Sequence, residues 1–168
     1  MSFPKPEIHQ KKVMLSVWWD MKGIIYYELL EKGQTINADR YSQQLIRFNQ
    51  AIEEKRPFGG KGRRKVILLH DNARPHVAIS TRKTIEDLSW EVLPHPAYSP
   101  DLAPSDYHLF RSTEHFLRDK SFENEQHIKK ELDLFFESQL VAFYQRGIRM
   151  LPDRWEKVII NKGNYFDD

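Results

Sequence analysis

The sequence contains no cysteine. This absence excludes disulfide bridges and cysteine-ligated zinc, and it is compatible with a reducing compartment such as the cytosol or the nucleus. No apolar run approaches the roughly 18 residues that would cross a bilayer, and residues 1–12 lack the apolar core of a secretory signal. We therefore expect a soluble intracellular protein with no membrane partner.

The sequence also lacks an excess of charge of one sign. Lysine and arginine number 26 against 24 aspartates and glutamates, which gives a formal net charge of +2. Because the net charge is so small, any nucleic-acid interface must be argued from local patches. Hydrophobic residues make up 40% of the 168 residues, which is enough for one domain with a sizeable core.

The first part of the chain has the pattern of a β-hairpin. Residues 1–11 are expected to form an irregular lead-in, because two prolines discourage regular structure there. Residues 12–20 (KVMLSVWWD) form a near-continuous apolar run, which is typical of a strand covered on both faces. Residues 24–30 (IIYYELL) follow a glycine-containing turn and predict the second arm of the hairpin.

Helices and short strands are expected to alternate after the hairpin. Asn37 or Asp39 can cap an amphipathic helix that ends before Pro57. Further elements are expected as a buried strand at 65–70, a helix at 77–88, a short strand at 90–93, and helices within 121–168, one entered through Pro152. This order predicts a single α/β domain over 1–168, with a mixed sheet and helices on its faces.

Two aspartates carry the candidate chemistry. Asp71 ends the strand at 65–70, and Asp106 opens a helix that Ser105 can cap, with 34 residues between the two aspartates. In an open α/β sheet the functional crevice lies beyond the carboxyl ends of the strands, so both side chains can converge there. Close carboxylates repel each other, and they gain most by sharing a divalent cation such as Mg²⁺ or Mn²⁺. Two such ions can activate a water and stabilise the leaving oxygen in phosphodiester cleavage.

Structural roles are the alternative for these aspartates. An aspartate at a strand end often stabilises a turn, and Asp106 could serve only the amino terminus of a helix. Asp101 is the rival of Asp106, but it lies beside a proline, where aspartate commonly stabilises a turn. The histidines fit no common zinc spacing: His70, His76, His95 and His108.

Several segments resemble the mariner transposase family. Residues 70–76 (HDNARPH) resemble the motif around the family's second catalytic aspartate. Residues 98–104 (YSPDLAP) match the signature before the third acid, and residues 105–108 (SDYH) resemble the segment that holds this acid at the mariner spacing. Further similar segments extend the resemblance over nearly the whole chain: 17–20 (VWWD), 26–30 (YYELL), 90–95 (WEVLPH), 154–157 (RWEK) and 164–166 (NYF).

The resemblance implies a ribonuclease H-like fold and a metal-dependent DNA strand transferase of the DDD class. Such an enzyme hydrolyses a phosphodiester at the transposon end and uses the freed 3′-hydroxyl to attack a TA target. The family binds DNA as a dimer in the nucleus. Asp71 and Asp106 are then the catalytic residues that bind Mg²⁺ or Mn²⁺. His70 and His108 flank these acids and are expected to line the site, which Asn72 would position through hydrogen bonds.

A basic segment is the candidate DNA contact. Residues 55–65 contain six lysines and arginines, three glycines and no acid, which predicts a mobile loop. Because the resemblance places DNA nearby, we expect phosphate contacts from this loop, with a merely solvated loop as the alternative. The expected DNA-binding residues are Lys61, Arg63, Arg64 and Lys65.

One element of the family pattern has no counterpart in these residues. The family's first catalytic aspartate lies in a Gly-Asp-Glu-type segment on a strand upstream of the hairpin, whereas Glu7 is the only acid among residues 1–12. Asp20 ends the family's second strand and is not expected to substitute. We therefore expect a truncated catalytic domain that lacks the first, central strand and is inactive alone. The alternative is a non-catalytic remnant that binds DNA or dimerises with full-length transposase.

Overall fold

The computed structural model describes residues 14–31, 33–62 and 64–160, so the expected lead-in at 1–11 lies outside the described residues. Its strands are β1 (Met14–Asp20), β2 (Gly23–Leu30), β3 (Ile67–Leu68) and β4 (Glu91–Val92). Its helices are α1 (Ala38–Lys55), α2 (Arg74–Val77), α3 (Ile79–Asp87), α4 (Arg111–Leu117), α5 (Glu125–Ser138) and α6 (Val141–Ile160). A 3₁₀ turn, η2 (Pro100–Leu102), and a π-helical segment, η3 (Ser105–Phe110), precede α4.

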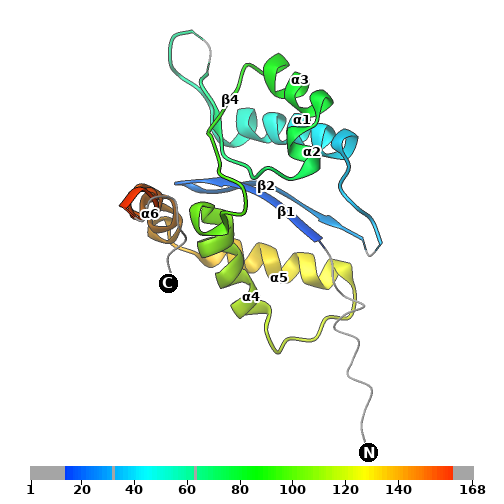
Figure 1. Ribbon diagram of the computed structural model, residues 1–168. Helices are drawn as coiled ribbons and strands as arrows, with labels where there is room; N and C mark the ends of the chain where they lie inside the picture. Colours follow the sequence, from blue (N-terminus) through cyan, green and yellow to red (C-terminus); the bar gives the residue numbers. More distant parts are fainter. Residues whose placement is uncertain (1–13, 32, 63, 161–168) are drawn as a thin grey trace, which may run out of the picture.

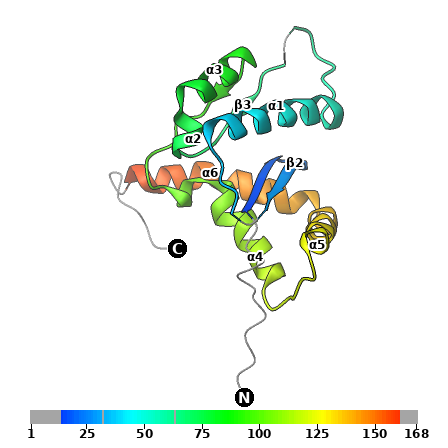
Figure 2. The same ribbon diagram turned by 90° about the vertical axis from the view of Figure 1, so that its right-hand side faces the viewer.

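The β1–β2 hairpin lies between two groups of helices (Figures 1 and 2). Helices α1, α2 and α3 lie on one side of it, and α4 and α5 lie on the other. Trp18 packs into a buried cluster with α1, β3 and α3, whereas Trp19 packs against the cluster formed by η3, α5 and α6. Successive strand residues point to opposite faces, so an apolar residue at nearly every position covers both sides of the hairpin. The expected hairpin with two buried faces is confirmed.

The four strands form two separate small sheets in the described residues, where a single mixed sheet was expected. β1 pairs with β2 in the antiparallel sense, and β3 pairs with β4 in the parallel sense. β3 is shorter than the strand expected at 65–70, and Ile67 is 58% exposed, so the expectation of a strand buried on both sides was wrong there. Among the described residues β3 pairs with β4 alone, so backbone hydrogen bonds between strands form along one edge of β3.

Helix α1 follows directly from local sequence signals. The Asn37 side chain accepts a hydrogen bond of 2.8 Å from the backbone N–H of Arg40 and so caps the helix. The residues at helical spacing are buried against the hairpin: Tyr41, Leu45, Phe48 and Ile52. The helix ends at Lys55, before Pro57, as expected.

Three helix boundaries differ from expectation. The helix expected at 77–88 begins earlier and is broken at Ala78 into α2 and α3. Pro152 lies inside α6 (Val141–Ile160) and does not open a new helix. Ser105 caps nothing: Pro104 precedes the π-helical segment, and the Ser105 hydroxyl instead accepts a 2.9 Å hydrogen bond from the Trp19 indole. No helix in the described residues is long and apolar enough to cross a bilayer.

Asp20 at the hairpin turn is bound by the end of α1. Its carboxylate accepts two 2.9 Å hydrogen bonds from the Arg56 guanidinium and one of 2.9 Å from the Lys22 backbone. Partial burial opposes ionisation of Asp20, but these hydrogen bonds prevail and lower the pKa of its carboxyl below 3.8. Asp20 is therefore a structural anchor, in agreement with the expectation that it does not replace a catalytic acid.

The Asp20→Asn variant is expected to lose about 0.5–1 kcal/mol of unfolding free energy near neutral pH, since the pair is partly exposed and screened by solvent. Because the folded pKa is lowered, the contribution is present above the unfolded value of 3.8 and is lost as pH falls through the folded pKa. Urea denaturation near neutral pH and below about pH 3 measures this difference. Asp87→Asn, at an exposed position on α3, is the control. An equal loss from Asp20→Asn at both pH values would contradict the role of the charge.

Candidate metal centre

Asp71 follows β3 and is oriented by its own loop. One carboxylate oxygen accepts a 2.9 Å hydrogen bond from the backbone N–H of Ala73 and lies 2.7 Å from Nδ1 of His76. An ionised carboxylate only accepts, so the imidazole donates at Nδ1. The hydrogen bond from His76, against the opposing effect of burial and with the help of the Ala73 N–H, lowers the pKa of Asp71 to about 2. Asp71 is therefore a preformed anion that is still half-exposed.

Aromatic side chains support the Asp71–His76 pair. The His76 ring stacks on His70 at 4.9 Å with an interplanar angle of 2°, and it lies 4.1 Å from the ring of Tyr41 on α1. The Tyr41 hydroxyl lies 2.8 Å from Nδ1 of His70. Burial lowers the pKa of His70 to about 4, and the neighbouring His76 contributes to the lowering. His70 is therefore a neutral partner that holds His76 in place behind Asp71.

Asn72 ties the Asp71 loop to the segment after β4. Its side-chain amide donates a 2.7 Å hydrogen bond to the carbonyl oxygen of His95. His95 lies within electrostatic reach of both candidate acids: it contributes to the lowered pKa of Asp71 and opposes the rise in the pKa of Asp106. Nδ1 of His95 is buried and has no hydrogen-bond partner among the described residues. These contacts gather both loops around the candidate acids.

Asp106 is the second residue of the π-helical segment η3. Its backbone N–H donates a 2.8 Å hydrogen bond to the carbonyl of Ala103, which fixes the start of the segment. Burial raises the pKa of the Asp106 carboxyl above 3.8, and the negative charge of Asp71 raises it further. Two carboxyl groups from distant parts of the chain therefore lie within electrostatic reach of each other.

This pair can do what neither carboxylate does alone. The carboxylate at 71 is held ionised, and the one at 106 becomes harder to ionise beside it, so a shared divalent cation would relieve their repulsion. Both groups offer the hard oxygen ligands that Mg²⁺ and Mn²⁺ prefer. Within residues 14–31, 33–62 and 64–160, no group of three or more histidine, cysteine or acidic side chains forms a complete metal cage. The residues fit part of a metal site.

Asp101, the rival candidate, lies in η2 (Pro100–Leu102). Both of its carboxylate oxygens are buried without a hydrogen-bond partner in the described part of the chain. Its backbone carbonyl accepts a 3.2 Å hydrogen bond from Arg154 on α6. Besides burial, the charge of Asp71 raises the pKa of Asp106. The buried carboxylate and the Arg154 contact favour a structural role for Asp101.

His108, which was expected to line the site, packs against α6. Its ring lies 4.3 Å from Phe143 and stacks with Trp19, and its Nε2 donates a 2.7 Å hydrogen bond to the Phe143 carbonyl. Burial lowers the pKa of His108, and the other groups that act on it are Phe143 and Arg146 of α6. Residues two positions apart on a helical segment do not face each other, so the contacts of His108 with α6 do not bring its ring beside the Asp106 carboxylate.

The basic segment is only partly available for DNA. Arg64 donates a hydrogen bond to the carbonyl of Arg56 and lies over the ring of Phe58. Lys65 pairs with Glu91 at 3.4 Å across the β3–β4 sheet, and both side chains are exposed. Lys61 is exposed, and Arg63 lies outside the described residues. DNA contact by these four residues stays a prediction.

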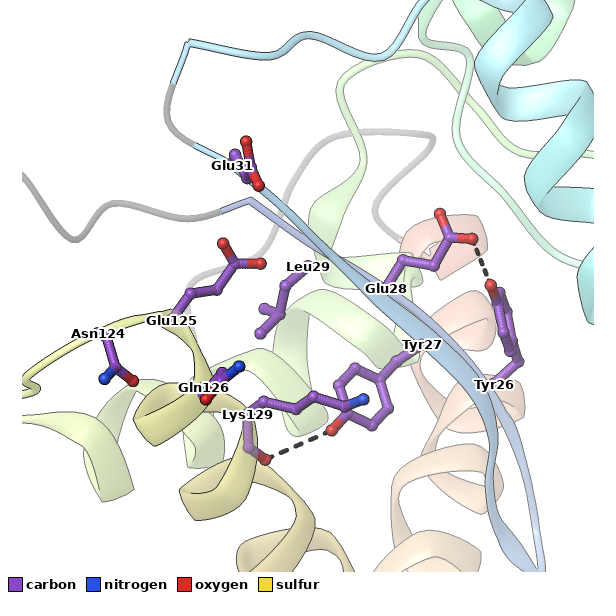
Figure 3. A pocket seen from close by; sticks show the side chains of 9 residues that line it. All are labelled: Tyr26, Tyr27, Glu28, Leu29, Glu31, Asn124, Glu125, Gln126 and Lys129. Atoms are coloured by element: carbon purple, nitrogen blue, oxygen red, sulfur yellow. Dashed lines mark hydrogen bonds between the residues drawn. The ribbon is translucent and has the colours of Figure 1, made fainter.

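Two cavities differ in their relation to the acids. A cavity of about 410 Å³ borders the Asp71 loop, and its wall includes His70, Asn72, His76 and His95. A larger one, of about 900 Å³, lies between β2 and the start of α5, where the Tyr27 hydroxyl points toward the Lys129 carbonyl (Figure 3). No candidate site residue lines the larger cavity, so its size does not make it the functional site.

The sequence patterns missed the roles of two histidines. His76 hydrogen-bonds Asp71, and His95 acts on both acids, yet both were considered only as zinc ligands. The five-residue interval from Asp71 to His76 was visible in the HDNARPH segment, since a short helical turn after a strand end brings such residues together. His95 carried no comparable signal, because its position depends on the loop that follows β4.

The chain is similar to transposases in three comparisons. The family model described as "Transposase (partial DDE domain)" matches residues 1–61. The Mariner Mos1 transposase of Drosophila mauritiana is 52% identical over 166 residues, which cover 99% of this chain and 48% of that protein. This chain therefore spans about half the length of that curated relative.

Solved structures give the same assignment. The Mos1 transposase catalytic domain with Raltegravir and Mn has a TM-score of 0.88 and 55% identity, over 92% of this chain and 78% of that one. The Mos1 mariner paired end complex with Mn has a TM-score of 0.91 and 53% identity, over 99% of this chain and 48% of that one. The mixed α/β arrangement is thus that of the Mos1 catalytic domain, a ribonuclease H-like fold. The chain belongs to the mariner transposase family and corresponds to a region of its catalytic domain.

Proposed function

We propose that this chain supplies two carboxylates of a divalent-cation site for cutting and rejoining DNA at transposon ends. The observation that carries the proposal is electrostatic: the charge of Asp71 raises the pKa of Asp106, although 34 residues separate them. The Mos1 structures with Mn, with Mg and as a paired end complex support a divalent metal and transposon-end DNA as the ligands.

Asp71 and Asp106 would hold the cation, Mg²⁺ or Mn²⁺. When bound, the metal supplies an activated water and stabilisation of the leaving oxygen. The protein's own groups prepare the site: His76 keeps Asp71 ionised, and Asn72 fixes the loop against His95. Burial raises the pKa of Asp106, and so does the charge of Asp71; a bound cation would relieve this repulsion, so binding is favoured by charge as well as by ligand type.

A third acid is the missing part of this proposal. The described residues present two carboxylates at the site, and Asp20 is held by Arg56 at the hairpin turn. In the family the first aspartate comes from the strand upstream of the hairpin. We propose that these 168 residues alone do not cut DNA, and that the family's first strand would pair between the β1–β2 and β3–β4 sheets.

The proposed transposase function also implies partners for this chain. We propose that DNA is bound along the exposed Lys61 and its neighbours Arg63, Arg64 and Lys65, and that the chain pairs with a second copy on transposon-end DNA in the nucleus. The complete enzyme would join the cut transposon end to target DNA at a TA site. The second candidate function is non-catalytic DNA binding or dimerisation with full-length transposase, and a cleavage assay distinguishes the two.

A nuclease assay on a nicked transposon end tests the proposal. With Mn²⁺, this chain alone is expected to leave the DNA intact. Extending the chain upstream with the family's first strand and its Gly-Asp-Glu segment is expected to produce Mn²⁺-dependent cleavage. In the extended chain, Asp71→Ala and Asp106→Ala should each abolish cleavage, because each removes a metal ligand.

Asp153→Ala, at an exposed position on α6, is the matched control and should cleave like the extended parent. If the unextended chain cleaves the DNA and Asp71→Ala abolishes this cleavage, the proposal that these 168 residues alone are inactive is wrong. An extended, folded and DNA-binding chain that never cleaves would favour the non-catalytic function.

A further inference from the structure

The segment that carries Asp106 is not stabilised by its own sequence. It is a π-helical turn, and no side chain caps its start at Pro104. π-helical geometry is rare and is found mostly as short bulges, frequently at functional sites. A segment of this kind keeps its shape only if the surrounding structure fixes it. The contacts that fix it therefore determine where the Asp106 carboxylate points.

Two side-chain hydrogen bonds join this segment to α6. The Tyr107 hydroxyl donates a hydrogen bond to the Gly147 carbonyl, and His108 donates to the Phe143 carbonyl at 2.7 Å. A Cβ at Gly147 would lie 2.4 Å from the His108 ring, so glycine allows α6 to approach this closely. The two residues that follow Asp106 are thereby fastened to α6.

Arg154 on α6 reaches both sides of Asp106. Its guanidinium carbon lies 4.1 Å over the centre of the Tyr107 ring, and Nη1 donates a 3.2 Å hydrogen bond to the Asp101 carbonyl. Arg154 is 7% exposed, which is rare for an arginine. It thus connects the 3₁₀ turn before Asp106 with the residue directly after it.

A buried guanidinium is an unlikely choice if packing alone were needed. Burying a charged group is costly, and a well-packed apolar residue of similar volume is often as stabilising or more so. Arginine offers a planar group that can stack on an aromatic ring and donate hydrogen bonds at its edge at the same time.

We propose that Arg154 is a positioning residue for the metal centre: by joining Asp101 to Tyr107, it holds the Asp106 carboxylate toward Asp71. The inference rests on the proposed metal site, because it assigns Arg154 a role in orienting one of the ligands. Arg154 touches neither the metal nor the DNA in this role.

The test uses Arg154→Met and Arg154→Lys in the full chain, with two readouts. Amide hydrogen exchange measures the mobility of residues 102–110, and calorimetric titration with Mn²⁺ measures the metal site. Arg154→Met is expected to speed exchange of 102–110 more than that of β2, and to weaken Mn²⁺ binding roughly 10-fold, as for outer-shell residues of metal sites. Arg154→Lys keeps the charge over Tyr107 but not the planar edge, so it should fall between methionine and arginine.

Arg149→Met, at an exposed position on the same helix, is the control and should change neither readout. Exchange that rises evenly over α6 and β2, together with unchanged Mn²⁺ affinity, would reduce Arg154 to a structural role and overturn the inference. If Arg154→Met does not fold, the same two measurements on Arg154→Lys, exchange of 102–110 and Mn²⁺ affinity, test the inference. If the parent chain binds no Mn²⁺, the proposed metal site fails, and local exchange at 102–110 still decides whether Arg154 holds this segment.

Discussion

Replacing Asp106 by asparagine is expected to weaken Mn²⁺ binding on the order of 100-fold, at least as much as loss of an outer-shell residue in known metal sites. Asparagine keeps the shape of the side chain but removes the charge that repels Asp71 in the free protein and attracts the cation in the bound one. Asp71→Asn should have a similar effect, and it also removes the negative charge of the group that His76 hydrogen-bonds. Isothermal titration calorimetry of Mn²⁺ measures both.

The double variant separates a shared cation from two independent ones. If Asp71 and Asp106 bind the same ion, Asp71→Asn combined with Asp106→Asn should weaken binding little beyond either single change, because residues of one site are not additive. Asp101→Asn is the control from the same loop, and it should leave the affinity within about 3-fold, which is small against the tenfold effects of outer-shell residues. Fully additive losses, or an effect of Asp101→Asn as large as that of Asp106→Asn, would contradict the assignment.

Leu109→Ala is expected to lower the free energy of unfolding by about 3 kcal/mol, as for other fully buried leucines. Leu109 lies three residues after Asp106 and is 0% exposed. It packs into the cluster that includes Ile128, Leu132 and Phe136 on α5. Truncation leaves a cavity beneath the π-helical segment, and the loss is a large part of a typical total of about 5–15 kcal/mol. Urea denaturation followed by circular dichroism measures the change.

Leu134→Ala is the matched control, because Leu134 on α5 is 52% exposed. Its effect should stay within about 0.5 kcal/mol, as for most surface substitutions. A loss below about 1 kcal/mol for Leu109→Ala would mean that the segment carrying Asp106 is not anchored in the core, since burial of this leucine would then contribute little.

Elements with strong local signals could be predicted from the sequence. The hairpin and α1 carry apolar patterns of the correct period, a capping asparagine and a terminating proline, and they form as expected. The assignment of the two candidate acids stays a prediction, because β3 ends at Leu68, before Asp71, and Asp106 lies in a π-helical segment that Ser105 does not cap. Local propensity and tertiary packing agree in the hairpin and α1, so the sequence alone was enough there.

Elsewhere the outcome depends on tertiary contacts that no local pattern encodes. Ser105 resembles a helix cap, but its hydroxyl is occupied by Trp19 from the hairpin. Pro152 resembles a helix start, yet it lies inside α6, whose residues Gly147 and Arg154 contact the segment around Asp106 on either side of the proline. His108 flanks an acid in the sequence, but the helical rotation turns it to Phe143. Long-range partners decided each case.

The central claim is that Asp71 and Asp106 bind one and the same divalent cation. Anomalous diffraction at the manganese edge, from crystals of this chain soaked with Mn²⁺, tests it most directly. We predict a manganese peak within about 2.0–2.3 Å of a carboxylate oxygen from each of the two residues, the range of hard-metal ligand distances. Manganese held by only one of them, or only at other acidic residues, would contradict it.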